Sequence, residues 1–289
     1  MRKTIKIFFA IIFIRSFSSC EDVIQIKLDE GTKLLVVDAF INDMRTPQRV
    51  RLTLSDSYFS GVNPPGVLGA NVVLNDLTNS KSFNFTDIGN GDYNYNLNPL
   101  DTIAFVNHAY QLEVNYNGFK YTSTATEFRT TPVNDITVNY REATAFTNAG
   151  YYCVLWGVDK TGPVSDYYWI KSFKNGVFYG KGSQMNLAID GAGGSGADGY
   201  LFIPPIASRI TPRGEVFQSN DICRVEIHSL SLETYNFLDQ TRSQTTNSGL
   251  FATTPENVKT NIITPNGATT KALGWFNVAA VGFMEKTIP

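Results

Sequence analysis

Histidine is scarce in this chain of 289 residues, which contains only His108 and His228. A zinc site or a general base built on histidine needs partner residues at suitable spacing, and no spacing of acids or cysteines suggests such partners. The nucleophile elbow G-x-S-x-G of serine hydrolases is missing, because residues 193–197 read GGSGA. Phosphate-binding glycine loops and dinucleotide fingerprints are missing as well. The sequence therefore predicts no catalytic residue, no metal ligand and no cofactor, and both histidines are expected to be structural or exposed.

Charged side chains are sparse, since Asp, Glu, Lys and Arg make up 17% of the chain, and no stretch concentrates Lys and Arg. Without such a cluster the sequence offers no phosphate-binding surface, so we do not expect nucleic acid as a partner. The formal net charge of −2 conceals a more acidic main part, because residues 1–19 carry four basic residues and no acid. Removing them lowers Lys+Arg from 24 to 20 against 26 acids, which leaves a net charge of −6.

The N-terminal apolar stretch is too short to cross a membrane as a helix, which takes ~20 residues. Residues 7–14 are apolar and follow a basic start, a pattern typical of a secretory signal peptide. Residues 17–20 read FSSC and resemble a bacterial lipobox, which predicts a signal peptide over residues 1–19 and lipid attachment at Cys20. Arg15 and Phe17 depart from the usual pattern, and an ordinary signal peptide followed by a chance cysteine is the alternative.

Two acids, Glu21 and Asp22, directly follow the predicted lipid attachment site and resemble a surface-export signal. We therefore expect an outer-membrane protein that is anchored by lipid and displayed at the cell surface, with the periplasmic face of the outer membrane as the alternative. Two further cysteines, Cys153 and Cys223, could form one disulfide in such an oxidising compartment. Two buried free thiols are the equally weighted alternative.

The sequence after residue 31 is rich in short runs that alternate apolar and polar residues, as β-strands with one buried face do. Val50, Leu52 and Leu54 follow this pattern, and two alternating runs flank the turn Asn117-Gly118, which predicts a tight hairpin. About seven such strands between residues 32 and 131 predict a β-sandwich of immunoglobulin-like or prealbumin-like kind. Residues 20–31 are expected to form a tether between this sandwich and the lipid.

A polar break at residues 130–132, which read TTP, predicts a domain boundary. Residues 132–289 are expected to form a second β-rich domain with one short helix over residues 231–243, which Ser231 would cap. Residues 273–283 are expected to form a final strand. The predicted fold class is therefore all-β, with two β-rich domains.

Aromatic residues are plentiful, and four of them stand out as candidates for ligand binding: Trp156, Tyr167, Trp169 and Trp275. Exposed aromatic rings bind the faces of sugars or peptide side chains at little entropic cost, so these residues could form a stacking platform for a glycan or peptide ligand. Aromatic residues at strand spacing more often fill a core, and that interpretation competes with the platform.

Four segments of the chain, taken in order, resemble a family of Bacteroidota lipoproteins called domain of unknown function 4249. They are the opening strand pair at residues 33–41 and 50–55, the DYYW motif at 166–169, the helix at 230–238, and the closing motif between residues 257 and 276. The resemblance covers nearly the whole chain after the signal peptide. It implies an envelope lipoprotein often encoded near TonB-dependent receptors, and it transfers no catalytic residue.

These observations favour a non-catalytic binding or accessory module anchored in the outer membrane, which acts with a TonB-dependent transporter. A structural or adhesive cell-surface protein is the first alternative, because a β-sandwich serves either purpose. A hydrolase of surface polymers is the second alternative, since the fold could bring together two acids that are distant in sequence.

Overall fold

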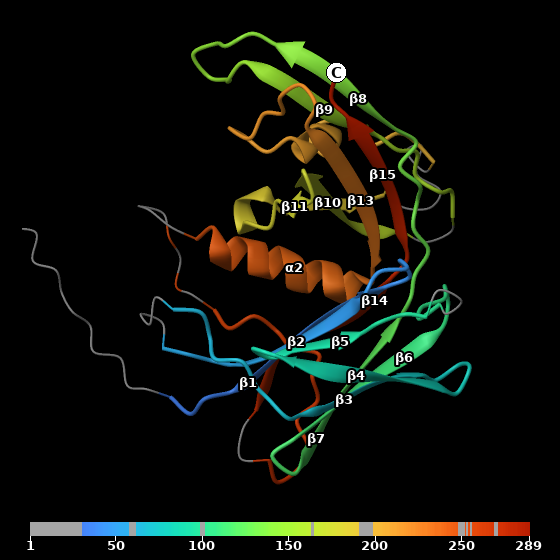
Figure 1. The fold of residues 1–289 in the computed structure, drawn as a ribbon, viewed down its shortest axis with the longest axis vertical. Coiled ribbons are helices and arrows are strands. Elements are labelled where there is room, and N and C mark those ends of the chain that lie inside the picture. Colours follow the sequence, from blue (N-terminus) through green and yellow to red (C-terminus); the bar gives the residue numbers. More distant parts are fainter. Residues whose placement is uncertain are drawn as a thin grey trace, which may run out of the picture. The chain divides into compact units, whose positions relative to one another are not determined.

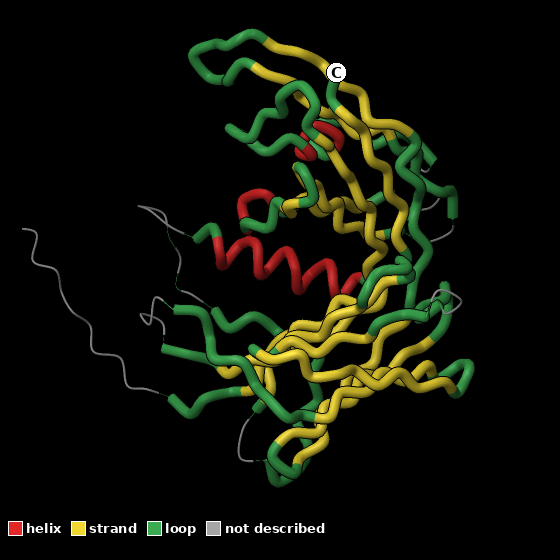
Figure 2. The backbone as a smooth tube through the Cα atoms, viewed as in Figure 1, coloured by secondary structure: helices red, strands yellow, loops and turns green. Residues whose placement is uncertain are grey.

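The computed structural model shows an all-β protein with one α-helix among the described residues, which confirms the predicted fold class (Figures 1 and 2). It describes residues 31–57, 62–98, 102–162, 165–190, 199–247, 252, 254, 256–268 and 271–289. The predicted signal peptide, Cys20 and nearly all of the predicted tether lie outside the described residues. No helix within the described ranges is long and apolar enough to span a membrane.

Eight strands form one continuous hydrogen-bonded sheet, in the order β14-β1-β2-β5-β4-β3-β6-β7. Their bounds are β1 Leu35–Asn42, β2 Gln48–Leu54, β3 Asn71–Asp76, β4 Lys81–Gly89, β5 Asp92–Tyr95, β6 Ala109–Tyr116, β7 Phe119–Thr126 and β14 Ala272–Ala279. Every neighbouring pair is antiparallel except β1 and β14, which run parallel. Seven strands from the first half of the chain are therefore joined by one strand from its end.

The sheet bends at strand β4. Its first residues pair with β3 and its last residues pair with β5, with a shift of register between Asp87 and Gly89. A strand that changes partner at a bulge lets one sheet fold into two packed layers, and a single apolar cluster fills the space between them. The far edges of the sheet also meet, because Phe128, just after β7, bridges to Ala279 at the end of β14. The sheet is therefore nearly closed.

The sequence pattern explains the strands of this sheet. Along β1, Leu35, Val37 and Ala39 are buried while Asp38 between them is exposed. The predicted hairpin is confirmed as β6 and β7, whose turn residues Asn117 and Gly118 have φ values of 50° and 77°. A two-residue turn with both φ values positive matches the twist of paired strands, and asparagine followed by glycine tolerates it best.

The second half of the chain builds a five-stranded sheet in the order β11-β10-β13-β15, with β12 paired to β10, and a separate pair β8-β9. The strand bounds are β8 Asp135–Arg141, β9 Gly150–Trp156, β10 Tyr167–Lys174, β11 Val177–Phe178, β12 Asn186–Ile189, β13 Ile222–Leu230 and β15 Val281–Thr287, and two short 3-10 helices are η1 Gly182–Gln184 and η2 Ala207–Ile210. A second apolar cluster, which includes Ile136 of β8, Leu155 of β9 and Val225 of β13, packs the pair against the larger sheet.

Helix α2, Leu232–Thr245, lies between the two large sheets (Figure 1). Its predicted cap is confirmed, because the Ser231 hydroxyl accepts the backbone N–H of Thr234 at 3.1 Å. The ring of Phe237 stacks on Trp275 of β14 at 4.5 Å between centroids. The indole N–H of Trp275 donates to the Thr234 hydroxyl at 3.0 Å, and that hydroxyl donates to the Asn277 side chain at 3.0 Å. The helix is therefore fixed to the parallel strand of the first sheet.

The predicted final strand over residues 273–283 is wrong in one respect: the structure divides it into β14 and β15, which belong to different sheets. The break falls at Ala280, where the backbone leaves the first sheet. Ser229 at the end of β13 fixes this residue, because the Ser229 N–H donates to the Ala280 carbonyl and the Ala280 N–H donates to the Ser229 hydroxyl, both at 3.0 Å.

The predicted domain boundary between residues 131 and 132 stays a prediction. The sheets do not divide there completely, because β14 comes from the second half of the chain and pairs with β1 along eight residues, from Leu35↔Ala272 to Asn42↔Ala279. Residues Lys33–Pro289 form one compact unit.

The close approach of β14 to β1 leaves no room for a side chain at Gly274. A Cβ at this position would lie 1.9 Å from the Val37 carbonyl oxygen, and the φ of Gly274 is 96°. We expect Gly274→Ala to destabilise the protein by about 3 kcal/mol or more, because the added carbon forces the two strands apart. Chemical denaturation measures the loss.

Gly267→Ala is the matched control, because its φ is also positive, at 80°, and nothing lies within 4 Å of the added carbon. It should cost only the ~1–2 kcal/mol of a left-handed backbone. Equal losses in the two variants would contradict the close contact between β14 and β1.

A buried acid, Glu127, lies beside the place where the edges of the first sheet meet. Its side chain is fully buried, and neither carboxylate oxygen has a hydrogen-bond partner among the described residues. Burial, followed by the negative charges of Asp43 and Asp76, raises the pKa of Glu127 to about 8. The folded protein therefore holds a proton on Glu127 that the unfolded chain releases near pH 4.5.

Stability should consequently fall as pH rises from about 4.5 to about 8, since the folded state binds the extra proton throughout this window. Glu127→Gln mimics the protonated side chain, so it should stabilise the protein by at least about 2 kcal/mol at pH 8 and by little at pH 4. Denaturation of both proteins at a series of pH values measures the difference. The exposed Glu142→Gln variant should follow the parent at every pH, and a Glu127→Gln profile that does the same would overturn the assignment.

Candidate functional site

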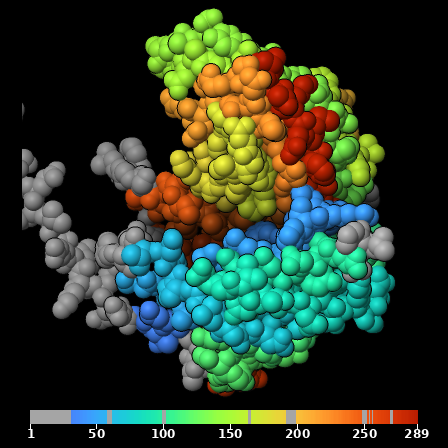
Figure 3. Space-filling view, in the orientation of Figure 1, coloured from blue at the N-terminus to red at the C-terminus, as the bar shows by residue number. Residues whose placement is uncertain are grey.

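A cavity of about 670 Å³ opens beside the β8-β9 hairpin. Its walls come from the end of β8 and the middle of β9, from η1 with the residue before it, and from the segment 208–215. Figure 3 shows these segments side by side on one face, coloured green, yellow and orange. The volume falls within the range of ~300–1,000 Å³ typical of small-molecule sites.

Hydrogen bonds to β9 position the wall formed by residues 208–215. Phe217 and Tyr151 exchange both backbone hydrogen bonds, at 2.9 and 3.0 Å. Further into the cavity, the Thr211 hydroxyl accepts the Cys153 N–H at 2.8 Å and donates to the Cys153 carbonyl at 3.0 Å. A strand therefore fixes this loop at two points, as loops that carry binding residues require.

Four basic side chains line the cavity: Arg141, Lys181, Arg209 and Arg213. Glu215 is the single acid among the lining residues. Within the described ranges none of the four cations takes part in an ion pair.

The cavity is therefore positively charged, although the chain as a whole carries a net charge of −2. The Arg141 guanidinium lies over the Tyr152 ring, 4.5 Å from its centroid, which restrains this long side chain. Concentrated positive charge in a concave surface attracts anions and accelerates their association. Ser183, Gln184 and Ser208 add hydroxyl and amide groups to the lining. The arrangement is suited to a ligand that carries acidic groups on a polar framework.

Sequence reasoning missed this site, because its cations are spread from residue 141 to residue 213 and no short stretch contains more than two of them. The fold brings them together by placing η1 and the loop after η2 beside the β8-β9 hairpin. The only local signal is the pair Arg209 and Arg213, which lie within five residues of each other.

The structure does not assemble the four predicted stacking aromatics into one platform. Trp156 of β9 is half-exposed and makes no ring contact with the other three within the described part of the chain. Tyr167 lies against Tyr235 of α2, at 5.5 Å between centroids. Trp169 packs on Phe40 of β1 at 5.6 Å, and Trp275 is buried under α2. Three of the four therefore serve packing between α2 and the two large sheets, as the core interpretation predicts.

The two predicted disulfide partners do meet. Cys153 of β9 and Cys223 of β13 are both buried, and in the structure both are free thiols. A hydrogen bond with the Cys153 thiol, followed by burial, raises the pKa of Cys223. The structure therefore places the two thiols close together, while the disulfide and the free-thiol alternative both stay predictions.

Both histidines pair with acids. His108 Nδ1 lies 2.9 Å from the Asp76 carboxylate, and His228 Nε2 lies 2.8 Å from that of Glu226. Burial, followed by the positive charge of Lys171, lowers the pKa of His228 to about 4. His228 is therefore neutral at pH 7 and donates to Glu226, an arrangement that satisfies two buried polar groups.

Comparison with solved structures finds weak likenesses to two proteins. The FN1–FN3 domains of chicken CNTN1 match with 11% identity and a TM-score of 0.23, over 71% of this chain and 65% of that one. A 1.5-MDa bacterial ice-binding adhesin matches with 12% identity and a TM-score of 0.18, over 90% of this chain and 65% of that one. The chain thus spans less than two thirds of either structure, and TM-scores this low carry no argument about its function.

None of the curated proteins matches this chain. A family comparison does match: residues 21–283 fit the family described as domain of unknown function (DUF4249). The match extends from the residue after Cys20 into β15, so it includes both large sheets, α2 and the residues that line the cavity. The chain therefore belongs to the DUF4249 family, as its sequence motifs predict.

Proposed function

We propose that this protein is a non-catalytic binding module, anchored by lipid at Cys20 on the outer membrane, which presents an anionic ligand to a TonB-dependent transporter. The basic cavity is the observation that carries the proposal. It gathers four cations, none of them in an ion pair among the described residues, around about 670 Å³ on a protein that is acidic overall. A cavity of this charge is a binding site for carboxylate, sulfate or phosphate groups.

An acidic oligosaccharide is the ligand class that fits the lining best. Arginine binds planar acidic groups through two parallel hydrogen bonds, and the cavity has Arg141, Arg209 and Arg213 for this purpose. The hydroxyl and amide groups of Ser183 and Gln184 match the hydroxyl groups of a sugar. The ligand is held by complementarity, with no covalent step.

The proposed lipid anchor and the proposed cellular location rest on the sequence. The lipobox-like residues 17–20, followed by Glu21 and Asp22, support attachment to the outer membrane and display at the cell surface. The family's lipoproteins are often encoded near TonB-dependent receptors, which supports a transporter as the partner. An adhesive surface protein and a hydrolase of surface polymers are the competing functions.

The double substitution Arg209→Gln with Arg213→Gln tests the cavity. We expect it to weaken binding of polygalacturonate, used as the acidic probe, by at least about tenfold, since a hydrogen bond to a charged group contributes ~1.5–3 kcal/mol. Binding to the parent protein should weaken as salt is raised and should be absent for neutral dextran. Titration of the full chain in detergent measures each affinity.

The matched control replaces two exposed cations outside the cavity, Lys259→Gln with Lys271→Gln, and it removes the same charge. Its affinity should equal that of the parent. Equal loss in both double variants would show that only net charge matters, and the cavity assignment would fail. Stronger binding of polyglutamate than of polygalacturonate would assign the ligand to acidic peptides.

Replacing Cys20 with alanine tests the anchor. The parent should incorporate a palmitate analogue and sediment with outer membranes, whereas Cys20→Ala should do neither. Cys153→Ala keeps the lipidation signal and should behave as the parent does. Labelling of Cys20→Ala at the parental level would contradict attachment at this residue.

Affinity purification of the lipidated full chain from gently solubilised outer membranes, followed by mass spectrometry, tests the partner. A TonB-dependent receptor should co-purify in near-equal amount. If the protein instead arrives with matrix polymers and without a receptor, the adhesive function replaces the transport function.

A further inference from the structure

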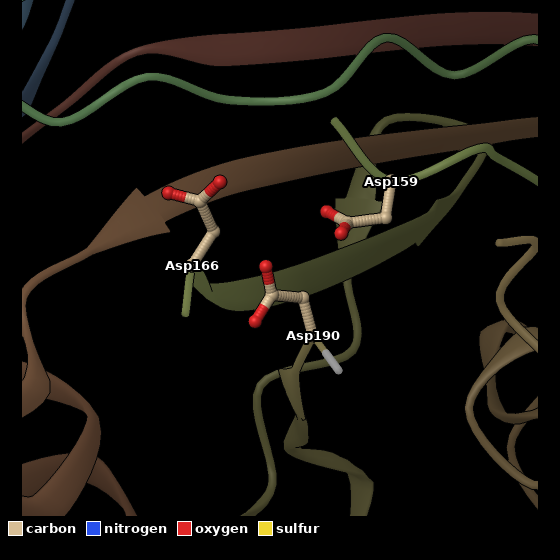
Figure 4. A group of neighbouring side chains, drawn as sticks. All are labelled: Asp159, Asp166 and Asp190. Carbon is tan, nitrogen blue, oxygen red and sulfur yellow. The ribbon is translucent and has the colours of Figure 1, made fainter. Parts of the chain in front are cut away.

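Three aspartates, Asp159, Asp166 and Asp190, converge on one point at the ends of three strands (Figure 4). Asp159 follows β9, Asp166 directly precedes β10, and Asp190 directly follows β12. One oxygen from each carboxylate lies within 4.8 Å of the others. All three side chains are buried, with 6%, 7% and 9% of their residue surfaces exposed, respectively.

The backbone brings these residues together. Strands β10 and β12 are antiparallel with Tyr167 opposite Ile189, so their next residues outward, Asp166 and Asp190, also face each other. The Asp190 N–H donates to the Asp166 carbonyl at 3.0 Å. The Asp159 N–H donates to the Tyr200 carbonyl at 3.0 Å, which fixes the third aspartate beside the pair.

Within the described ranges, two of the three carboxylates have buried oxygens without a hydrogen-bond partner. The Tyr168 hydroxyl donates to Asp159 Oδ1 at 2.7 Å, while Asp159 Oδ2 has no partner among the described residues. Arg129 contacts Asp166 at Oδ2, through Nε at 2.8 Å and through a terminal nitrogen at 2.7 Å. Both oxygens of Asp190 are buried without a partner in the described part of the structure. A buried carboxylate without a partner destabilises the folded protein, and a bound ligand would offset this loss of free energy.

The charges lead to the same conclusion. Three carboxylates carry −3 when ionised, and Arg129 is the one cation paired with them among the described residues, which leaves −2. A divalent cation would neutralise the remainder and provide the missing partner for each free oxygen.

We propose that Asp159, Asp166 and Asp190 bind one hard divalent cation, Ca²⁺. Calcium takes oxygen ligands at ~2.3–2.6 Å, and two oxygens that are each about 2.4 Å from one ion lie at most about 4.8 Å apart. The separations within the cluster fit this limit. The ligand set contains only oxygen, which favours calcium or magnesium over zinc, and carbonyl groups or water complete the six to eight ligands that calcium needs.

The bound ion joins three segments that no single sheet unites: the end of β9, the start of β10 and the end of β12. It therefore stabilises the junction between the β8-β9 pair and the larger sheet. Residues 152–154 in the middle of β9 line the cavity, whereas Asp159 lies beyond the end of this strand. The ion therefore does not contact the proposed anionic ligand. The calcium site goes beyond the binding function proposed above and does not depend on it.

Calorimetric titration of the full chain, stripped of metal by a chelator, tests the site. We expect one Ca²⁺ per chain and a melting temperature that rises with Ca²⁺ concentration, as binding to the folded state requires. Asp190→Asn should weaken Ca²⁺ binding at least about 100-fold and should melt above the parent when both are free of metal, because it removes a buried repelling charge. A purely structural aspartate would not give this reversal.

Glu142→Gln, an exposed substitution outside the cluster, should bind Ca²⁺ as the parent does. If Asp190→Asn does not fold, Asp159→Asn replaces it, and Tb³⁺ provides a measurement on the parent itself. Tyr168 donates to Asp159, so Tb³⁺ in the site should luminesce when tyrosine is excited, and Ca²⁺ should displace it. No Ca²⁺ binding up to about 10 mM, well above the ~1 mM of the weakest extracellular calcium modules, would overturn the proposal. Unchanged affinity in both aspartate variants would overturn it too.

Discussion

The parallel pairing of β14 with β1 is the interaction on which the rest of this structure depends. It places a strand from the end of the chain beside the first strand, across a separation of more than 200 residues. The segments between them, including strands β8 to β13, must fold so that this strand can return to β1. Because β14 passes at Ala280 into β15, it joins the nearly closed first sheet to the second sheet. Helix α2 secures the joint through Trp275, whose ring stacks on Phe237 and whose N–H donates to Thr234.

This joint gives the protein a rigid support for two sites of opposite charge. The basic cavity lies beside the β8-β9 hairpin, where loops are fixed to strand β9 by Thr211 and Phe217. The acidic cluster lies beyond the end of β9, where Asp159 meets the ends of two neighbouring strands. Sites held by strands keep their geometry better than sites held by loops alone. The two sites lie apart along β9, so the proposed anionic ligand and the proposed Ca²⁺ would not contact each other.

Sequence reasoning succeeded where structure is local. The alternation of residues in β2, the Asn117-Gly118 hairpin and the Ser231 cap each depend on neighbours a few positions away. It failed where partners are distant. The pairing of β14 with β1 leaves no local trace, and the predicted last strand was therefore not divided at Ala280. The fold alone determines which strand an apolar run joins.

The same distinction between local and distant partners applies to the basic cavity and the aspartate cluster. The four cations of the cavity come from three segments, so no stretch of sequence displays them, and the aromatic residues that do stand out serve packing instead. Sequence reasoning predicted no metal ligand, so it did not group Asp159, Asp166 and Asp190 as a site. Their one signal is position, because each carboxylate lies at the end of a strand, and the register of β10 with β12 determines that Asp166 faces Asp190.

Native-state hydrogen exchange is the measurement that tests the central claim most directly, namely that the pairing of β14 with β1 makes residues Lys33–Pro289 one cooperative unit. Amides of β1, β14 and β13 should all exchange through global unfolding, with the same free energy of opening and the same dependence on denaturant. If β1 and β14 open together at a clearly lower free energy than β13, or if the two sheets unfold in separate transitions, the pairing does not join them and the account is contradicted.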